Sequence, residues 1–216
     1  MRVLSVSGFK NSGKSTLCRE LIAYARRDGL SVGYVKRTGE ALSSPEGTDS
    51  ARVSALGVAT LLWNGGDIRY EHTVPGDADP LWVAGKFFPG ADLVIVEGGK
   101  ELALPKIWVL REGEERPDYP GIFALYDRHG EGDGADRYGR GEVPRLAARV
   151  CETVRRARVR TRVYIDDAPL PVKDFISDFV EGGVRGMLGS LKGVPDEGRS
   201  GALRIYIAPP EKNEKK

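Results

Sequence analysis

The stretch GFKNSGKST, residues 8–16, directly follows the apolar run VLSV, residues 3–6. It fits the pattern G-x-x-x-x-G-K-[ST], which forms a loop whose backbone N–H groups surround phosphates. Behind the stretch, apolar residues recur at the spacing of one helix face until Asp28 and Gly29 end the pattern. A strand, a glycine loop and an amphipathic helix in this order predict a nucleotide-phosphate site.

Each polar residue of this loop has a predicted task. The backbone N–H groups of Asn11 to Ser15 would wrap the β-phosphate, at the positive end of the helix that starts at Lys14. Lys14 would neutralise oxygens of the β- and γ-phosphates, and the Ser15 hydroxyl would join a Mg²⁺ shell. The predicted phosphate-binding residues are Gly8, Lys10, Asn11, Ser12, Gly13, Lys14, Ser15 and Thr16.

A loop of this kind needs an acidic residue at the end of a neighbouring strand to hold magnesium, directly or through water. The run DLVIVEGG, residues 92–99, places Glu97 at the carboxyl end of a strand, where ligands of open α/β sheets bind. Asp49, at a helix start, is a weaker candidate for the magnesium site, and Lys36, at the end of the second strand, is a weaker candidate for binding the nucleotide. Asp49 fits an N-terminal helix cap equally well. The predicted catalytic residues are Lys14, Glu97 and Asp49, and the predicted metal ligands are Ser15, Asp49 and Glu97.

Composition excludes several other classes of function. The 216 residues carry a net charge of only +2, which does not favour nucleic acid as a partner. Two distant cysteines give neither a disulfide framework nor a zinc site, and two histidines are too few for a histidine-based metal site. With no signal sequence and no apolar run long enough to span a bilayer, we expect a cytoplasmic protein without membrane contact.

Short apolar runs alternate with helical patterns, which predicts a P-loop NTPase-like three-layer α/β/α domain with a mostly parallel sheet. The predicted strands are 3–7, 31–36, 59–63, 93–97, 106–110 and 122–126, with 68–74 as a possible antiparallel edge. Helices are predicted from Lys14, after Thr48 and over 143–156. The glycine-rich residues 129–142 read as a polar loop too hydrophilic to pack.

The basic segment 155–162 marks a change of composition. We divide the chain into a nucleotide-binding domain at 1–157, a small α+β extension at 158–208 and a solvated tail at 209–216. The extension is predicted as strand, helix and strand, ending with a strand at 203–207. It is too small to bury much surface alone, so docking on the first domain or on a second copy is expected.

Four motifs together resemble the molybdopterin-guanine dinucleotide biosynthesis protein B (MobB) family over residues 2–127. They are GFKNSGKST, EGTDSARVSALGVA, DLVIVEGGK and PKIWVLR, with Lys36 ending the second strand. The resemblance implies a GTP-binding adapter or weak GTPase that assists attachment of GMP to molybdopterin. It also implies that Gly8 to Thr16 hold the phosphates, that Asp49 and Glu97 lie near magnesium, and that the protein is a homodimer working beside a MobA-like nucleotidyltransferase.

This chain departs from the family pattern after the second strand. Where family sequences carry a histidine cluster, it has Lys36-Arg37-Thr38-Gly39-Glu40, so only Lys36 and Thr38 carry over. No N-K-x-D motif specifies guanine, and the choice of GTP over ATP rests on the resemblance. Asp127 could bond the guanine N1–H and N2–H₂ groups or be a solvated loop residue.

Hydrolysis should be slow because the chain contains no glutamine to orient water. Two alternatives stay open. One is a P-loop small-molecule kinase that transfers a γ-phosphate to a metabolite, with Arg128, Arg137 and Arg140 as lid residues. The other is a docking module in the extension, where Phe175, Phe179 and Met187 share a helix face.

Overall fold

The computed structural model describes residues 2–40, 42–74, 76–133, 135–157, 161–166, 168–192, 202–205 and 207. The chain groups into two compact units: Met1–Arg158 with Tyr164–Leu170, and Val159–Val163 with Pro171–Lys216. In the part of the chain that the structure describes, no helix is both long and apolar enough to cross a bilayer.

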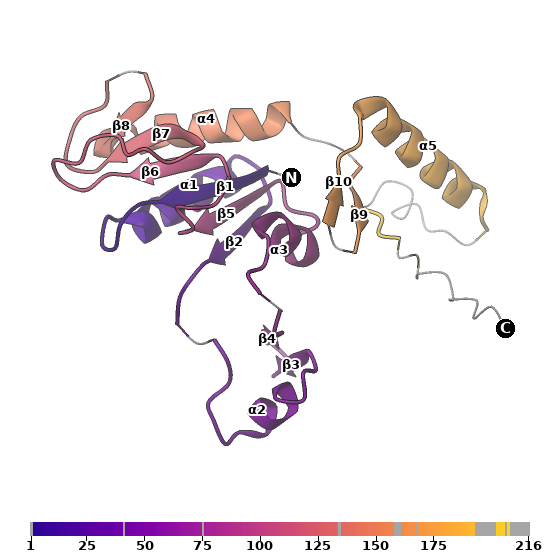
Figure 1. Cartoon of the computed structure of the whole chain (residues 1–216). Coiled ribbons are helices and arrows are strands. Elements are labelled where there is room, and N and C mark those ends of the chain that lie inside the picture. The colour runs from indigo at the N-terminus through magenta and orange to yellow at the C-terminus, as the bar shows by residue number, and fades with distance from the viewer. Residues whose placement is uncertain are drawn as a thin grey trace. The chain divides into compact units, whose positions relative to one another are not determined.

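The first unit is built on a six-stranded sheet in the order β2-β5-β1-β6-β7-β8, with every neighbouring pair parallel (Figure 1). Apolar residues dominate its central strands, as expected for a parallel sheet covered on both faces. The strands are β1 (Arg2–Ser7), β2 (Val32–Lys36), β5 (Leu93–Glu97), β6 (Lys106–Val109), β7 (Ile122–Asp127) and β8 (Arg137–Gly139). The predicted α/β class is confirmed.

Helices cover both faces of this sheet. On one face α1 (Lys14–Arg27) and α4 (Val143–Arg156) pack together, and Leu17, Leu21 and Leu146 join the strand residues in the largest core cluster. On the other face Ala84 of α3 (Pro80–Phe87) packs with Val94 and Val96. The successive strand residues Ile95 and Val96 belong to opposite clusters, as the alternation of side chains along a strand requires.

Two sequence predictions about this unit are wrong, and one helix was missed. Residues 68–74 do not form an edge of the main sheet: β4 (Ile68–Glu71) pairs antiparallel with β3 (Thr60–Trp63) in a separate sheet that follows α2 (Asp49–Ser54). Residues 129–142 contain β8 and the 3₁₀ turn Arg140–Glu142, because backbone pairing with β7 satisfies a segment that has few apolar side chains. Helix α3 was not predicted, although Asp79 and Pro80 are a typical helix start.

The residues predicted as the extension contain the strands β9 (Val163–Ile165) and β10 (Ala168–Leu170), which pair with each other, and helix α5 (Asp174–Ser190). Strand β10 belongs to the first compact unit and α5 to the second. The predicted last strand at 203–207 is not found in its described residues, 203–205 and 207, and the predicted tail lies outside the described residues. Phe175, Phe179 and Met187 of α5 are exposed.

Candidate functional site

The phosphate loop joins β1 to α1 through a backbone that only glycine tolerates at two points. A Cβ on Gly8 would lie 2.6 Å from the carbonyl oxygen of Val109, and Gly13 has a φ of 99° where the helix begins. The first turn of α1 is closed by N–H groups of Thr16 and Leu17, which donate to the Gly13 carbonyl. The N–H groups at this positive end of the helix suit an anion.

Lys14 points back across the loop. Its ammonium group donates to the carbonyl oxygen of Phe9, so the positive charge lies within the turn of the loop. Burial lowers the pKa of Lys14, and the nearby Glu97 carboxylate partly offsets this effect. A phosphate bound in the loop would act as Glu97 does and favour the charged ammonium.

Glu97 is the last residue of β5, and its side chain contacts residues of α1 and β2. Its side chain is buried, with 4% of the residue exposed. Ser15 of α1 donates to its Oε1 at 2.8 Å, and Tyr34 of β2 donates to its Oε2 at 2.6 Å. The structure therefore brings the two predicted residues Ser15 and Glu97 into direct contact at the carboxyl edge of the sheet.

The charge of Glu97 is stabilised without an ion pair. Burial raises its pKa, but the hydrogen bonds from Tyr34 and Ser15 and the charges of Lys36 and Lys14 outweigh burial, so the pKa is lowered overall. Lys36 is the register partner of Glu97 on β2. Among the described residues, no lysine or arginine nitrogen lies within 4.0 Å of this carboxylate. Glu97 is thus ionised and available to a cation.

This donor set fits magnesium. A serine hydroxyl and a carboxylate are hard oxygen ligands, and Mg²⁺ in phosphate sites takes one or two protein oxygens and completes its shell with phosphates and water. In the described residues no group of three or more His, Cys, Asp or Glu could hold a metal by itself. A metal here would therefore depend on a bound nucleotide, with Ser15 and Glu97 as the protein ligands.

Two features that hold the loop after Glu97 were missed from the sequence. The Gly98 carbonyl accepts hydrogen bonds from the buried hydroxyls of Ser5 and Ser7, at 2.9 and 3.1 Å. The fully buried Lys106 donates to the carbonyls of Lys100 and Leu102, at 2.7 and 2.8 Å. The available signal was the presence of polar residues inside otherwise apolar strands, since buried polar groups need partners.

Asp127 ends β7 and already has partners for both carboxylate oxygens. Its Oδ1 accepts from the backbone N–H groups of His129 and Gly130, and its Oδ2 accepts from Arg137 at 2.5 Å. Burial raises the pKa of Asp127, but these contacts outweigh it and lower the pKa. Bonding to a guanine would require Asp127 to exchange the Arg137 contact, so that role stays a prediction.

Asp49 lies in a different setting. Its side chain is 97% exposed and pairs with Arg52 one turn further along α2, at 3.2 Å. The helix is capped by the Thr48 side chain, which accepts from the Ala51 N–H, so the capping alternative for Asp49 is wrong. No described contact joins Asp49 to Glu97 or Ser15, and its role at the metal stays a prediction.

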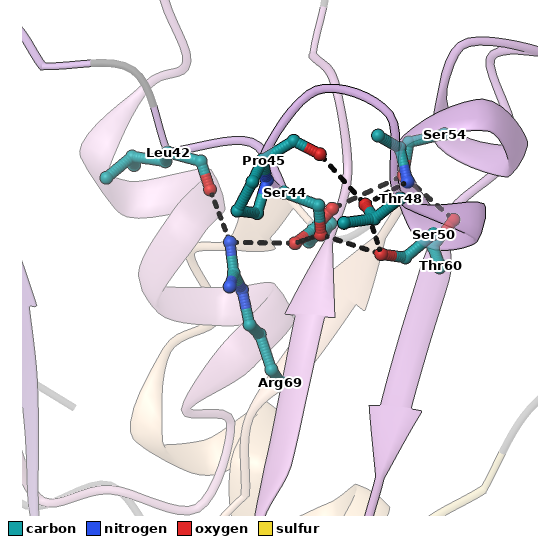
Figure 2. A network of polar contacts seen from close by, with 10 residues as sticks. Leu42, Ser44, Pro45, Thr48, Ser50, Ser54, Thr60 and Arg69 are labelled. Atoms are coloured by element: carbon teal, nitrogen blue, oxygen red, sulfur yellow. Dashed lines mark hydrogen bonds and ion pairs between the residues drawn. The ribbon is translucent and has the colours of Figure 1, made fainter.

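The segment around Asp49 is organised by another carboxylate, that of Glu71. Ser44 donates to its Oε1 at 2.6 Å, Ser54 donates to its Oε2 at 3.3 Å, and Arg69 pairs with Oε1 at 2.9 Å. Arg69 also donates to the Leu42 carbonyl. Figure 2 shows this network tying the chain before α2 to β4. We call residues 42–71 the arm.

The remaining predicted residues are more peripheral. Lys10 is exposed on the loop, Thr16 lies in the first turn of α1, and the Thr38 hydroxyl accepts from the Glu40 N–H at 3.1 Å. Ser12 is buried, and no described hydrogen bond reaches its hydroxyl.

Comparison with known proteins gives a consistent result. The model of the family "Molybdopterin guanine dinucleotide synthesis protein B" (MobB) matches residues 3–124. A putative molybdopterin-guanine dinucleotide biosynthesis adapter protein of Methanocaldococcus jannaschii is 25% identical over 222 residues, which cover 90% of this chain and 93% of the relative. A probable adapter protein of the same description from Bacillus subtilis is 29% identical over 117 residues, 52% of this chain and 67% of the relative.

Solved structures agree with these sequence matches. The crystal structure of a MobB protein homolog from Bacillus stearothermophilus superposes with a TM-score of 0.52 at 25% identity, covering 72% of this chain and 99% of the other. A second crystal structure, of molybdopterin-guanine biosynthesis protein B, has a TM-score of 0.56 at 24% identity and shares the fold, covering 70% and 99%. Because the family model spans more than half of the chain and includes both the phosphate loop and Glu97, this protein belongs to the MobB family.

Proposed function

We propose that this protein is a GTP-binding accessory protein of molybdenum cofactor biosynthesis, which assists the attachment of GMP to molybdopterin. The observation that carries the proposal is the contact between Ser15 of the phosphate loop and the buried, ionised Glu97. The names of the relatives, both molybdopterin-guanine dinucleotide biosynthesis adapter proteins, supply the pathway.

In this proposal the nucleotide is bound as its magnesium complex. The N–H groups at the start of α1 and the Lys14 ammonium bind the phosphates. Ser15 and Glu97 hold magnesium, whose bound charge neutralises phosphate oxygens. Asp49 is proposed as an additional group that reaches this ion through water, and its place on the exposed arm makes its contribution the smaller one.

Turnover by the isolated chain should be slow. A water-attacking reaction needs a group that orients or deprotonates water, and the sequence contains no glutamine. Each oxygen of Glu97 accepts one hydrogen bond, from Ser15 or from Tyr34, and the lowered pKa of Glu97 makes it a weak base. We therefore propose a protein that holds GTP and hydrolyses it weakly unless a partner nucleotidyltransferase of the MobA type completes the site.

The arm supports the proposed homodimer. Trp63 of β3 and Ile68 of β4 are register partners at one end of the two-stranded ribbon that β3 and β4 form. Both side chains are exposed, and the exposed fraction of Trp63 is 72%. Leu61 of the same ribbon is also exposed. Apolar side chains gathered on a small element are typical of an interface between subunits. Sedimentation of the full chain and of a Trp63→Ser variant should give the dimer mass and the monomer mass, respectively.

Calorimetry with the full chain tests the nucleotide assignment. Wild-type protein should bind GTP with magnesium, and Lys14→Ala should show no measurable binding because the charge in the loop is lost. Arg19→Ala is the matched control, since Arg19 is an exposed cation on α1 with no predicted role at the phosphates, and it should keep most of the affinity. If ATP binds to the wild type as tightly as GTP does, the guanine assignment is wrong.

A further inference from the structure

Arg128 lies beside the phosphate loop on the side away from Glu97. A Cβ built on Gly13 would meet both Cδ and Nη1 of Arg128 at 3.5 Å, so the arginine side chain covers the loop just before α1 begins. Arg128 follows Asp127 at the carboxyl end of β7. An exposed arginine from a distant part of the sequence is thereby placed against the predicted nucleotide site.

The turn that carries Arg128 is firmly held. Asp127 accepts hydrogen bonds from the N–H groups of His129 and Gly130 and pairs with Arg137. The Nε of Arg128 donates to Nε2 of His129 at 2.6 Å, which leaves both terminal nitrogens of the guanidinium group. Within the described residues no carboxylate pairs with Arg128. The planar guanidinium group of Arg128 is therefore held in place, and no carboxylate in the described residues neutralises its charge.

The order of the strands shows which end of a nucleotide this cation faces. In the order β2-β5-β1-β6-β7-β8, Glu97 and Lys36 lie on one side of β1, whereas Arg128 follows β7 on the other side. Magnesium bridges the outer phosphates, so the Ser15 and Glu97 side belongs to the γ-phosphate end. The opposite side of the loop is left for the nucleoside.

We propose that Arg128 binds the nucleoside half of the nucleotide, with its guanidinium plane against the purine base. This inference rests on the proposed function, because it concerns the same nucleotide. Arginine suits the task since a guanidinium group stacks on an aromatic ring and stays charged at every physiological pH. The role also separates Arg128 from Arg137, which the sequence grouped with it as a lid residue but which is bound to Asp127.

The test measures affinity for GTP, GDP and inorganic tripolyphosphate, each with magnesium, by calorimetry on the full chain. Arg128→Ala should lower the affinities for GTP and GDP equally, by about tenfold, which is the effect expected for the loss of a partly desolvated cation–π contact. The same variant should leave the affinity for tripolyphosphate unchanged, because that ligand has no nucleoside. Arg128→Lys keeps the charge but loses the plane and should fall between Arg128→Ala and the wild type.

Two variants serve as references in this series. Arg26→Ala removes an exposed arginine from the last turn of α1, at the opposite end of that helix from the phosphate loop, and should leave all three affinities unchanged. Lys14→Ala should weaken all three ligands, including tripolyphosphate. Thermal unfolding of Arg128→Ala should match the wild type, since the side chain is exposed.

The possible outcomes separate this inference from the function on which it rests. Unchanged GTP affinity in Arg128→Ala overturns the inference alone, and so does an equal loss for tripolyphosphate, which would make Arg128 a phosphate ligand. A wild type that binds no nucleotide overturns the proposed function and the inference together. A wild type that binds ATP in place of GTP overturns the guanine assignment only, and the same series with ATP and ADP then tests Arg128.

Discussion

The two regions organised by Glu97 and Glu71 look alike at first. Each carboxylate ends a strand, is largely buried and accepts a hydrogen bond from a serine hydroxyl. They differ in how the negative charge is balanced. Arg69 pairs with Glu71 at 2.9 Å, whereas two hydroxyls and two more distant lysines surround Glu97. The Glu71 charge is thus satisfied within the arm, and the Glu97 charge is left for an arriving cation.

The largest test of this comparison exchanges each carboxylate for its amide. Glu97→Gln keeps the shape but removes the charge, and it should weaken magnesium-dependent GTP binding about 10- to 100-fold, as the loss of a group supporting a metal site does. Glu71→Gln should leave that affinity unchanged and instead loosen the arm, because Arg69 loses its charged partner and an amide NH2 cannot accept the hydrogen bond that Oε2 accepts from Ser54.

Calorimetry gives both affinities, and limited proteolysis within residues 42–71 reports on the arm. A Glu71→Gln protein that loses GTP affinity as strongly as Glu97→Gln would show that the arm belongs to the nucleotide site.

The second test removes a hydrogen bond from Glu97 without touching its charge. Tyr34→Phe deletes the 2.6 Å contact to Oε2 and should weaken magnesium–GTP binding about fivefold, which corresponds to roughly 1 kcal/mol for one hydrogen bond. Ser44→Ala deletes the matching contact to Glu71 and is the control, with no expected change in affinity. Equal behaviour of the two variants would mean that Tyr34 does not orient the metal ligand.

A weaker effect is expected at Asp49. Asp49→Asn should lower magnesium–GTP affinity by about threefold or less, because the carboxylate is exposed and a screened charge contributes little. Arg52→Ala, which removes its partner, should have no larger effect. A loss as large as that of Glu97→Gln would instead show that the arm brings Asp49 to the ion when nucleotide binds.

The contrast between these residues also shows what the sequence can and cannot predict. Glu97 was predicted because a carboxylate after a buried parallel strand falls at the ligand-binding edge of the sheet, a consequence of chain direction alone. Tyr34 was not predicted, although it lies two residues before Lys36 on the same strand and so on the same face. The sequence shows that Tyr34 and Lys36 share a face of the strand. Knowing which of them contacts Glu97 also requires knowing that β2 lies beside β5.

Contacts between distant segments could not be predicted either, because they too depend on the order of the strands. The approach of Arg128 to Gly13 depends on β7 lying two strands from β1, and the partner of Glu71 depends on β3 and β4 leaving the main sheet to pair with each other. Local signals such as a glycine loop or a helix start contain no information on which strands become neighbours. Apart from α3 and β8, the elements of the first unit could be predicted, whereas the pairing of the strands could not.

The smallest effect that we expect is that of pH on the free energy of unfolding. Folding lowers the pKa of both carboxylates: burial of Glu97 is outweighed by Tyr34, Ser15 and the lysine charges, and the Ser44 hydrogen bond is the main cause for Glu71, with Arg69 adding to it. A carboxylate whose folded pKa is lowered stabilises the fold above its unfolded pKa, about 4.3 for glutamate, and loses that contribution as pH falls through the folded value.

The difference in unfolding free energy between wild type and Glu97→Gln should therefore be constant from pH 8 to about 5 and should shift against the wild type only below about 4.3. Urea unfolding at stepped pH measures it, with Glu71→Gln as the second series. Both series should have the same sign, because each carboxylate is ionised in the folded protein whether or not a positive side chain touches it. A Glu97 series that already shifts between pH 7 and 5 would mean that burial dominates, and Glu97 would then be protonated too readily to hold a metal ion at neutral pH.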